Sequence, residues 1–271
     1  MNNFYEKYRG IINLIIICVV IVFVKTFILT DKKSSKVSQE IKDDLIGTVE
    51  QAVEMLDEAQ KENPDFEKYK FENEGLIKDP SNNHEKELIF LTQGLQKFLK
   101  EDAIYTQKYQ KNSLNIDDLL EIKVLSNQQL VNEGINKIKH NNNEAKKYVH
   151  QYKRLHSELL SYLKANISKK TFDTFQDTAI ITRDETLDFF SKLEAQYQGM
   201  ITILNLANDI SRLGLFEIDG DNFYITDDVY LNKFNNLIEI HNNSVIELDE
   251  LRLKDIKKGK ENLEQLKKEF K

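Results

Sequence analysis

The sequence predicts a mainly α fold: an N-terminal transmembrane helix, then a bundle of long helices with one small β-hairpin near residues 215–226. The chain has 271 residues but only 2 Pro and 9 Gly, so few positions are suited to ending a helix. Hydrophobic residues make up 40%, which is enough for a buried core although 31% of the residues are charged. One run near the N-terminus is far more apolar than the rest.

That run extends from Ile11 to Leu29 and predicts a membrane span. As a helix it would be about 28 Å long at ~1.5 Å per residue, close to the hydrocarbon thickness of a bilayer. No small-residue processing site comes after it in "FILTDKKSSK", and Ile17 stands where a lipoprotein needs a small residue before Cys18. Residues 1–30 therefore predict an N-terminal tail and a retained single span. The abundant Lys, Asn and Ile are typical of an AT-rich bacterial genome, so we expect the bacterial cytoplasmic (inner) membrane.

The orientation of the span stays open. Basic residues flank it on both sides: Lys7 and Arg9 before it, and Lys32, Lys33, Lys36 and Lys42 after it. The count favours a cytoplasmic location for the bulk of the chain. However, lysine is abundant throughout, and a short basic tail before an apolar run is the usual pattern of a signal anchor that exports the rest of the chain.

Residues 31–62 predict a polar linker and then a helix with a heptad-like apolar seam. The seam consists of Ile41, Leu45, Thr48, Ala52, Met55 and Ala59, and Asn63-Pro64 ends it. It is too short to distinguish a coiled coil from a bundle helix with a narrow apolar face. Residues 63–83 contain both prolines and predict an irregular connection.

Residues 84–257 predict the helical bundle domain. Its first helix runs from about His84 to Lys111, and a short segment at 117–125 leads to a capping box at Ser126–Gln129. That box opens a long amphipathic helix whose weak point is "HNNN" at 140–143, which predicts a kink or a loop.

The second half of this domain predicts a helix at 169–181 and a capping box, "TRDE", at 182–185 that opens another helix ending at Gly214. "LFEIDGDNFYITDD" then alternates as a hairpin does, and Thr226 or Asp227 would cap the last helix. Residues 258–271 predict a charged, solvated tail.

The sequence predicts no catalytic, cofactor or metal site. "DGDN" at 219–222 suggests calcium, but Phe223 occupies a ligand position of an EF-hand loop and no glycine stands sixth, so a hairpin turn is favoured. The histidines form no H-E-x-x-H motif: His84, His140, His150, His156 and His241. The single cysteine, Cys18, excludes an intramolecular disulfide.

Charge and aromatic patterning bear on partners. The net charge of -7 and pI near 5.4 make nucleic acid an unexpected partner, because an acidic chain repels phosphates. Four tyrosines at helical spacing form either a recognition stripe or the edge of the core: Tyr105, Tyr109, Tyr148 and Tyr152. We expect the membrane, through Ile11 to Leu29, and partner proteins, with self-association left open.

The passage "LFEIDGDNFYITDDVYLNKFNNLIEIHN", between two long helices, resembles an uncharacterised family of bacterial envelope proteins, mostly lipoproteins. The resemblance covers residues 185–250 and rests on the pattern of Phe216, Gly220, Phe223, Asn235 and Leu237. It implies no activity. It does imply an extracytoplasmic domain, attached here by the span because the chain has no lipobox.

These observations predict a single-span membrane protein whose helical domain binds partner proteins as an envelope scaffold, adaptor or accessory subunit, without catalysis. The alternative is a cytoplasm-facing, membrane-tethered effector or regulator, for example in stress response or phage defence. A membrane-bound hydrolase is disfavoured because no nucleophile–base pair or metal set is found in the sequence.

Overall fold

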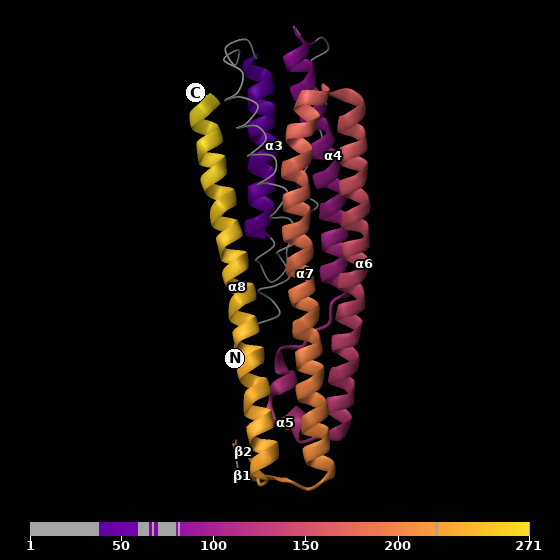
Figure 1. Cartoon of the computed structure of the whole chain (residues 1–271), viewed down its shortest axis with the longest axis vertical. Helices are drawn as coiled ribbons and strands as arrows, with labels where there is room; N and C mark the ends of the chain where they lie inside the picture. The colour runs from indigo at the N-terminus through magenta and orange to yellow at the C-terminus, as the bar shows by residue number, and fades with distance from the viewer. Residues whose placement is uncertain are drawn as a thin grey trace. The chain divides into compact units, whose positions relative to one another are not determined.

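The computed structural model describes residues 38–58, 65–66, 68–69, 80, 82–219 and 222–270. This part of the chain is mainly helical with one small antiparallel sheet, which confirms the predicted fold class at that level (Figure 1). In chain order the elements are α3 (Gln39–Glu58), α4 (Asn83–Asn112), the 3-10 helix η3 (Asp117–Leu120), α5 (Ile122–Leu125), α6 (Gln128–Asn166), α7 (Lys169–Arg212), β1 (Phe216–Asp219), β2 (Asn222–Ile225) and α8 (Asp228–Phe270).

The predicted tail and membrane span at 1–30 lie outside the described residues. Within the part that is described, every helix is too short or too polar to cross a bilayer. Most of the predicted connection at 63–83 also falls outside that part.

The described residues divide into two compact units. One comprises Lys111–Lys147 and Asp188–Leu251, and the other comprises the described residues before Lys111 together with Tyr148–Leu187 and those from Arg252 onward. We call them the hairpin unit and the α3 unit, after an element that each contains.

The heptad-like seam of α3 is buried within the α3 unit, at Ile41, Leu45, Thr48, Ala52 and Met55. The side-chain amide of Gln96 on α4 donates to Thr48 Oγ1 over 2.9 Å, and the backbone N–H of Ser38 donates to Glu85 Oε1 over 2.8 Å. Because both contacts advance in the same direction along the two helices, α3 runs parallel to α4. The seam therefore belongs to a helix of the bundle.

The predicted capping box at Ser126–Gln129 is wrong by one residue. Asn127 caps α6: its Oδ1 accepts the backbone N–H of Gln129 over 3.0 Å and that of Leu130 over 3.2 Å. The Ser126 hydroxyl instead donates back to the carbonyl of Ile122 over 2.7 Å, because Ser126 ends the short α5.

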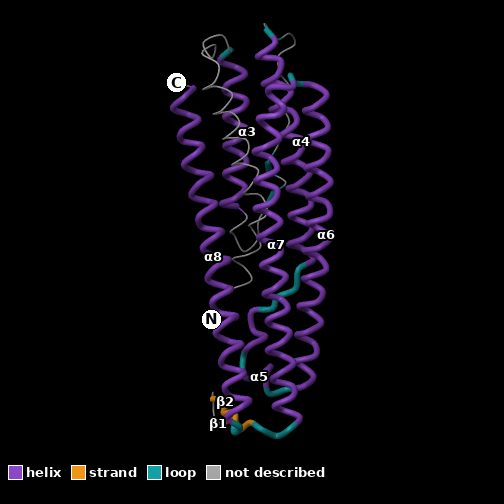
Figure 2. Tube along the Cα trace, viewed as in Figure 1, coloured by secondary structure: helices purple, strands orange, loops and turns teal. Residues whose placement is uncertain are grey.

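Of the two alternatives predicted for "HNNN", the loop is wrong, since α6 is continuous through 140–143 (Figure 2). Two of these polar side chains bind the end of α4 and the connection that comes after it. Asn141 accepts the N–H of Leu114 over 2.8 Å and donates to its carbonyl over 2.9 Å, and His140 Nε2 lies 2.8 Å from the carbonyl of Asn112. The cluster thus supplies hydrogen bonds to a non-helical segment.

The "TRDE" box at 182–185 does not open a new helix, because α7 is continuous from Lys169 to Arg212. The Thr182 hydroxyl donates to the carbonyl of Thr178 over 3.0 Å, and that of Thr186 donates to the carbonyl of Thr182 over 3.1 Å. A threonine that bonds one turn back stays inside a helix, so it does not act as a cap.

The predicted end of α7 and the hairpin are confirmed. Gly214 has φ +66°, and two bonds close the helix end: Gly214 N–H to the Ser211 carbonyl over 3.1 Å and Leu215 N–H to the Ile210 carbonyl over 3.0 Å. Strands β1 and β2 pair antiparallel from Phe216↔Ile225 to Asp219↔Asn222. The hairpin packs on a cluster formed by Leu206, Ile210, Ile225, Leu215, Phe216, Phe223, Tyr230, Leu231, Phe234 and Leu237.

Asp227 caps the last helix, accepting the N–H groups of Val229 and Tyr230 over 2.9 and 3.1 Å. The charged tail predicted at 258–271 is part of α8, which continues to Phe270, and it is not solvated throughout. Leu263 and Leu266 continue a heptad pattern and are buried. Two ion pairs of 2.8 Å join this end of α8 to α3 in antiparallel fashion: Lys260–Asp57 and Lys267–Glu50.

We expect Asn141→Ala to lower the free energy of unfolding by about 2–4 kcal/mol, because it removes two hydrogen bonds and leaves the N–H of Leu114 without its acceptor. Asn143→Ala, at an exposed position of the same cluster, should change it by less than about 0.5 kcal/mol. Urea unfolding of the full chain in mild detergent, monitored by circular dichroism, measures both. Equal effects of the two substitutions would contradict the bracing role of Asn141.

Candidate functional site

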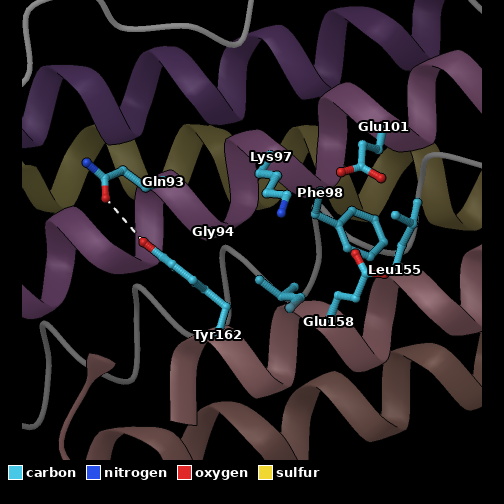
Figure 3. Close-up of a pocket in the computed structure, with 9 residues that line it drawn as sticks. Gln93, Gly94, Lys97, Phe98, Glu101, Leu155, Glu158 and Tyr162 are labelled. Carbon is cyan, nitrogen blue, oxygen red and sulfur yellow. Dashed lines mark hydrogen bonds between the residues drawn. The ribbon is translucent and has the colours of Figure 1, made fainter. Parts of the chain in front are cut away.

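A cleft opens between α4 and α6 in the α3 unit (Figure 3). It encloses about 210 Å³ and is lined by Gln93, Gly94, Lys97, Phe98, Glu101, Leu155, Glu158, Leu159 and Tyr162. Ligand pockets for small molecules usually exceed roughly 300 Å³. The cleft is therefore of a size to take one large side chain.

Gly94 makes the cleft possible. A Cβ atom at this position would lie 3.1 Å from Leu159 Cδ1 and 3.1 Å from Tyr162 Cδ1. Glycine thus lets these two side chains of α6 come close to the backbone of α4. Together with the buried Phe98 and Leu155 they give the cleft an apolar lining.

Arg154 organises one end of the rim. Its Nη1 lies 2.5 Å from Glu158 Oε1, and its Nη2 lies 3.4 Å from Glu101 Oε2. Nη2 also donates to the hydroxyl of Tyr105 over 3.0 Å, and the guanidinium lies 5.8 Å from the centre of that ring. Both carboxylates of the rim are therefore paired with the same cation, which Tyr105 holds in place.

At the other end, the Tyr162 hydroxyl donates to Gln93 Oε1 over 3.2 Å (Figure 3). Burial raises the pKa of Tyr162, so its hydroxyl is a hydrogen-bond donor at neutral pH. Phe90 meets the Tyr162 ring edge to face, with centroids 6.3 Å apart. Tyr162 therefore forms a fixed aromatic wall.

A buried carboxylate lies inside the same unit. Asp102 is fully buried, and its Oδ1 accepts the Tyr148 hydroxyl over 2.5 Å, whereas Oδ2 has no hydrogen-bond partner among the described residues. Burial raises the pKa of Asp102 to about 7, and the bond from Tyr148 partly opposes this. Burial also raises the pKa of Tyr148 well above its ordinary value.

Of the four tyrosines in the predicted stripe, Tyr109, Tyr148 and Tyr152 are buried, which confirms the interpretation that they belong to the core. Tyr148 stacks on Tyr152 with centroids 6.3 Å apart, and Tyr152 meets Phe98 of the cleft edge to face. This contact joins the buried aromatic cluster to the cleft lining. Tyr105 is half-buried and faces Arg154.

The structure does not bring the histidines together. His156 is buried with Nε2 3.0 Å from the Ala179 carbonyl, and burial lowers the pKa of both His156 and His241. Within the described part of the chain, no group of three or more His, Cys, Asp or Glu side chains is placed to hold a metal ion. Gly220 and Asp221, on which the calcium alternative depends, lie outside that part.

Sequence reasoning missed both Asp102 and the role of Gly94. A signal for Asp102 exists: it comes after Leu95, Phe98 and Leu99 at helical spacing, so a carboxylate occupies the buried face of α4. For Gly94 the sequence carries no such signal, because its role depends on two residues of another helix.

The arrangement is suited to binding. The cleft lining offers apolar surface, one amide, one phenol, the lysine Lys97 and two carboxylates paired with Arg154, and it contains no serine, cysteine or histidine. No protein-family model, curated protein or solved structure matches this chain. The resemblance of residues 185–250 to envelope proteins therefore stays a prediction.

We expect Asp102 to make stability depend on pH. Its folded-state pKa of about 7 exceeds the ordinary value of 3.8, so protonation favours the folded state. This contribution is complete below about pH 4 and is lost as the pH rises through about 7. The free energy of unfolding of the wild type relative to Asp102→Asn should fall by roughly 4 kcal/mol across that range, at 1.36 kcal/mol per pKa unit.

Chemical unfolding of both proteins at a series of pH values measures this difference. His156 and His241 act in the opposite sense, because their lowered pKa values make acid destabilising, but they are present in both proteins and cancel. A difference that does not change with pH would contradict the assignment.

Proposed function

We propose that this chain is a single-span bacterial membrane protein whose helical domain binds a partner protein at the cleft between α4 and α6, without catalysis. The observation that carries the proposal is the cleft itself: an apolar hole of side-chain size whose rim carboxylates are paired with Arg154. Holes of this kind accept the large anchor residue of a protein interface.

Binding to a protein is supported by how firmly the lining is held. Gly94 lies on a helix of 30 residues, and Leu159 and Tyr162 lie on one of 39 residues. Phe98 packs against Tyr152, and Arg154 is fixed by hydrogen bonds to four side chains: Gln151, Glu158, Glu101 and Tyr105. A preformed site loses little conformational entropy when a partner docks.

Membrane attachment rests on the apolar run from Ile11 to Leu29, and an envelope scaffold, adaptor or accessory subunit is the role that combines a span with a binding face. The cytoplasm-facing alternative, a tethered effector or regulator, is favoured by the lysines after the span, among them Lys32 and Lys33. The same binding face serves either role, so orientation decides between them.

We expect fusions at the C-terminus to report an extracytoplasmic domain: alkaline phosphatase, active only outside the cytoplasm, should be active, and a fluorescent protein that folds only inside should be dark. The reason is the signal-anchor pattern of residues 1–30. The opposite pair of results would establish the cytoplasm-facing alternative. A mature N-terminus near residue 30 would contradict the retained span.

We expect a photo-reactive amino acid placed at the exposed Gln93 to cross-link to a protein in intact cells. The matched control is Lys153, which is exposed on α6 and nine residues before Tyr162, hence about 180° around the helix from it. Mass spectrometry of the adducts identifies the partner. The absence of a Gln93 adduct, or identical adducts from both positions, would contradict binding at the cleft.

A further inference from the structure

We infer that the partner presents an acidic amphipathic helix to the face formed by α4 and α6, with an apolar residue seated in the cleft. The inference rests on the proposed function, and it adds the chemistry of the bound segment. Three observations on this face carry it: the line of apolar contacts, the sign of the charges, and the pairing of the carboxylates.

Two apolar residues, Phe90 and Ile104, lie on this face of α4 two heptads apart, with the cleft midway between them. Phe90, half-buried, precedes the cleft residue Lys97 by seven positions, and Ile104, 57% exposed, lies seven positions after it. Seven residues of helix correspond to about 10.5 Å. A helix that lies along the face and carries apolar residues at heptad spacing would therefore meet Phe90, the cleft and Ile104 in turn.

Three lysines lie along the same line: Lys86, Lys97 and Lys108 are exposed and eleven residues apart. At 100° per residue, eleven residues return to within about 20° of the starting direction, so all three lie on one strip of α4. Among the described residues, no carboxylate forms an ion pair with any of them.

The negative charges of the face are engaged. Glu101 and Glu158 share the single positive charge of Arg154, so this trio has a net charge of -1, which the three lysines outweigh. The chain as a whole has a net charge of -7, and α3 alone carries seven acidic residues and one lysine. A basic strip in an acidic chain selects an acidic partner through charge complementarity.

The test uses the full chain in zwitterionic nanodiscs and two fluorescent three-heptad peptides with the same leucine positions, one with glutamate and one with lysine on the polar face. We expect the acidic peptide to bind at least about ten times more tightly, with an affinity that falls as salt is added. Lys97→Glu and Ile104→Ser should each weaken it by about fivefold or more. Both residues are exposed, so neither change should affect folding.

Lys153→Glu and Ile181→Ser are matched controls at exposed positions off this face, and each should change the affinity by less than about twofold. Equal binding of the two peptides, or none of either, would overturn the inference. The inference would also be overturned if the protein bound vesicles of anionic lipid through Lys97 but did not bind the acidic peptide. If Gln93 cross-links to a protein in cells but the acidic peptide does not bind, the proposed function stands and only the inference of an acidic helix is overturned.

Discussion

The close antiparallel pairing of α4 with α6 is the constraint on which the α3 unit depends. Gly94 allows the approach, and Asp102 meets Tyr148 further along, 46 residues away in the chain. Beyond Gly94 toward the N-terminus of α4, Glu87 accepts the backbone N–H of Ser168 over 2.8 Å and the hydroxyl of Thr171 over 2.8 Å, so α4 also holds the start of α7. The cleft exists because these contacts fix two helices at a separation that leaves room for one side chain.

Burying the carboxylate of Asp102 between the two helices costs free energy, yet its contact with Tyr148 defines the register of α4 against α6. A slip of one heptad in one direction would place Leu155 opposite Asp102, and the carboxylate would then be buried without a hydrogen-bond donor. Apolar side chains alone discriminate poorly between registers, because one leucine packs much like another. Asp102 and Tyr148 are therefore better understood as a specificity contact of the bundle than as a source of stability.

The sequence predicts the features that are settled locally and fails where the partner is distant. Gly214 and Asp227 end and begin helices through bonds within a few residues, and both are predicted correctly. "HNNN" resembles a loop until Leu114, 27 residues upstream, is known to need its hydrogen bonds. "TRDE" is compatible with both a helix start and a helix interior, because a threonine hydroxyl can either cap a new helix or bond back to a carbonyl of the helix that contains it. In the cleft, the apolar residues can be inferred from periodicity, whereas the pairing of carboxylates with Arg154 requires the fold.

Arg154 lowers the negative charge of the face formed by α4 and α6. The chain uses lysine almost everywhere, so an arginine at this position points to geometry that lysine lacks: a planar fork that meets two carboxylates and the hydroxyl of Tyr105. A lysine ammonium carries the same single charge but lacks the planar fork that holds both carboxylates at fixed positions. Glu101 and Glu158 pair with Arg154. Neither carboxylate therefore forms an ion pair with Lys86, Lys97 or Lys108. A single side chain thus fixes the two carboxylates at one end of the cleft and halves their negative charge.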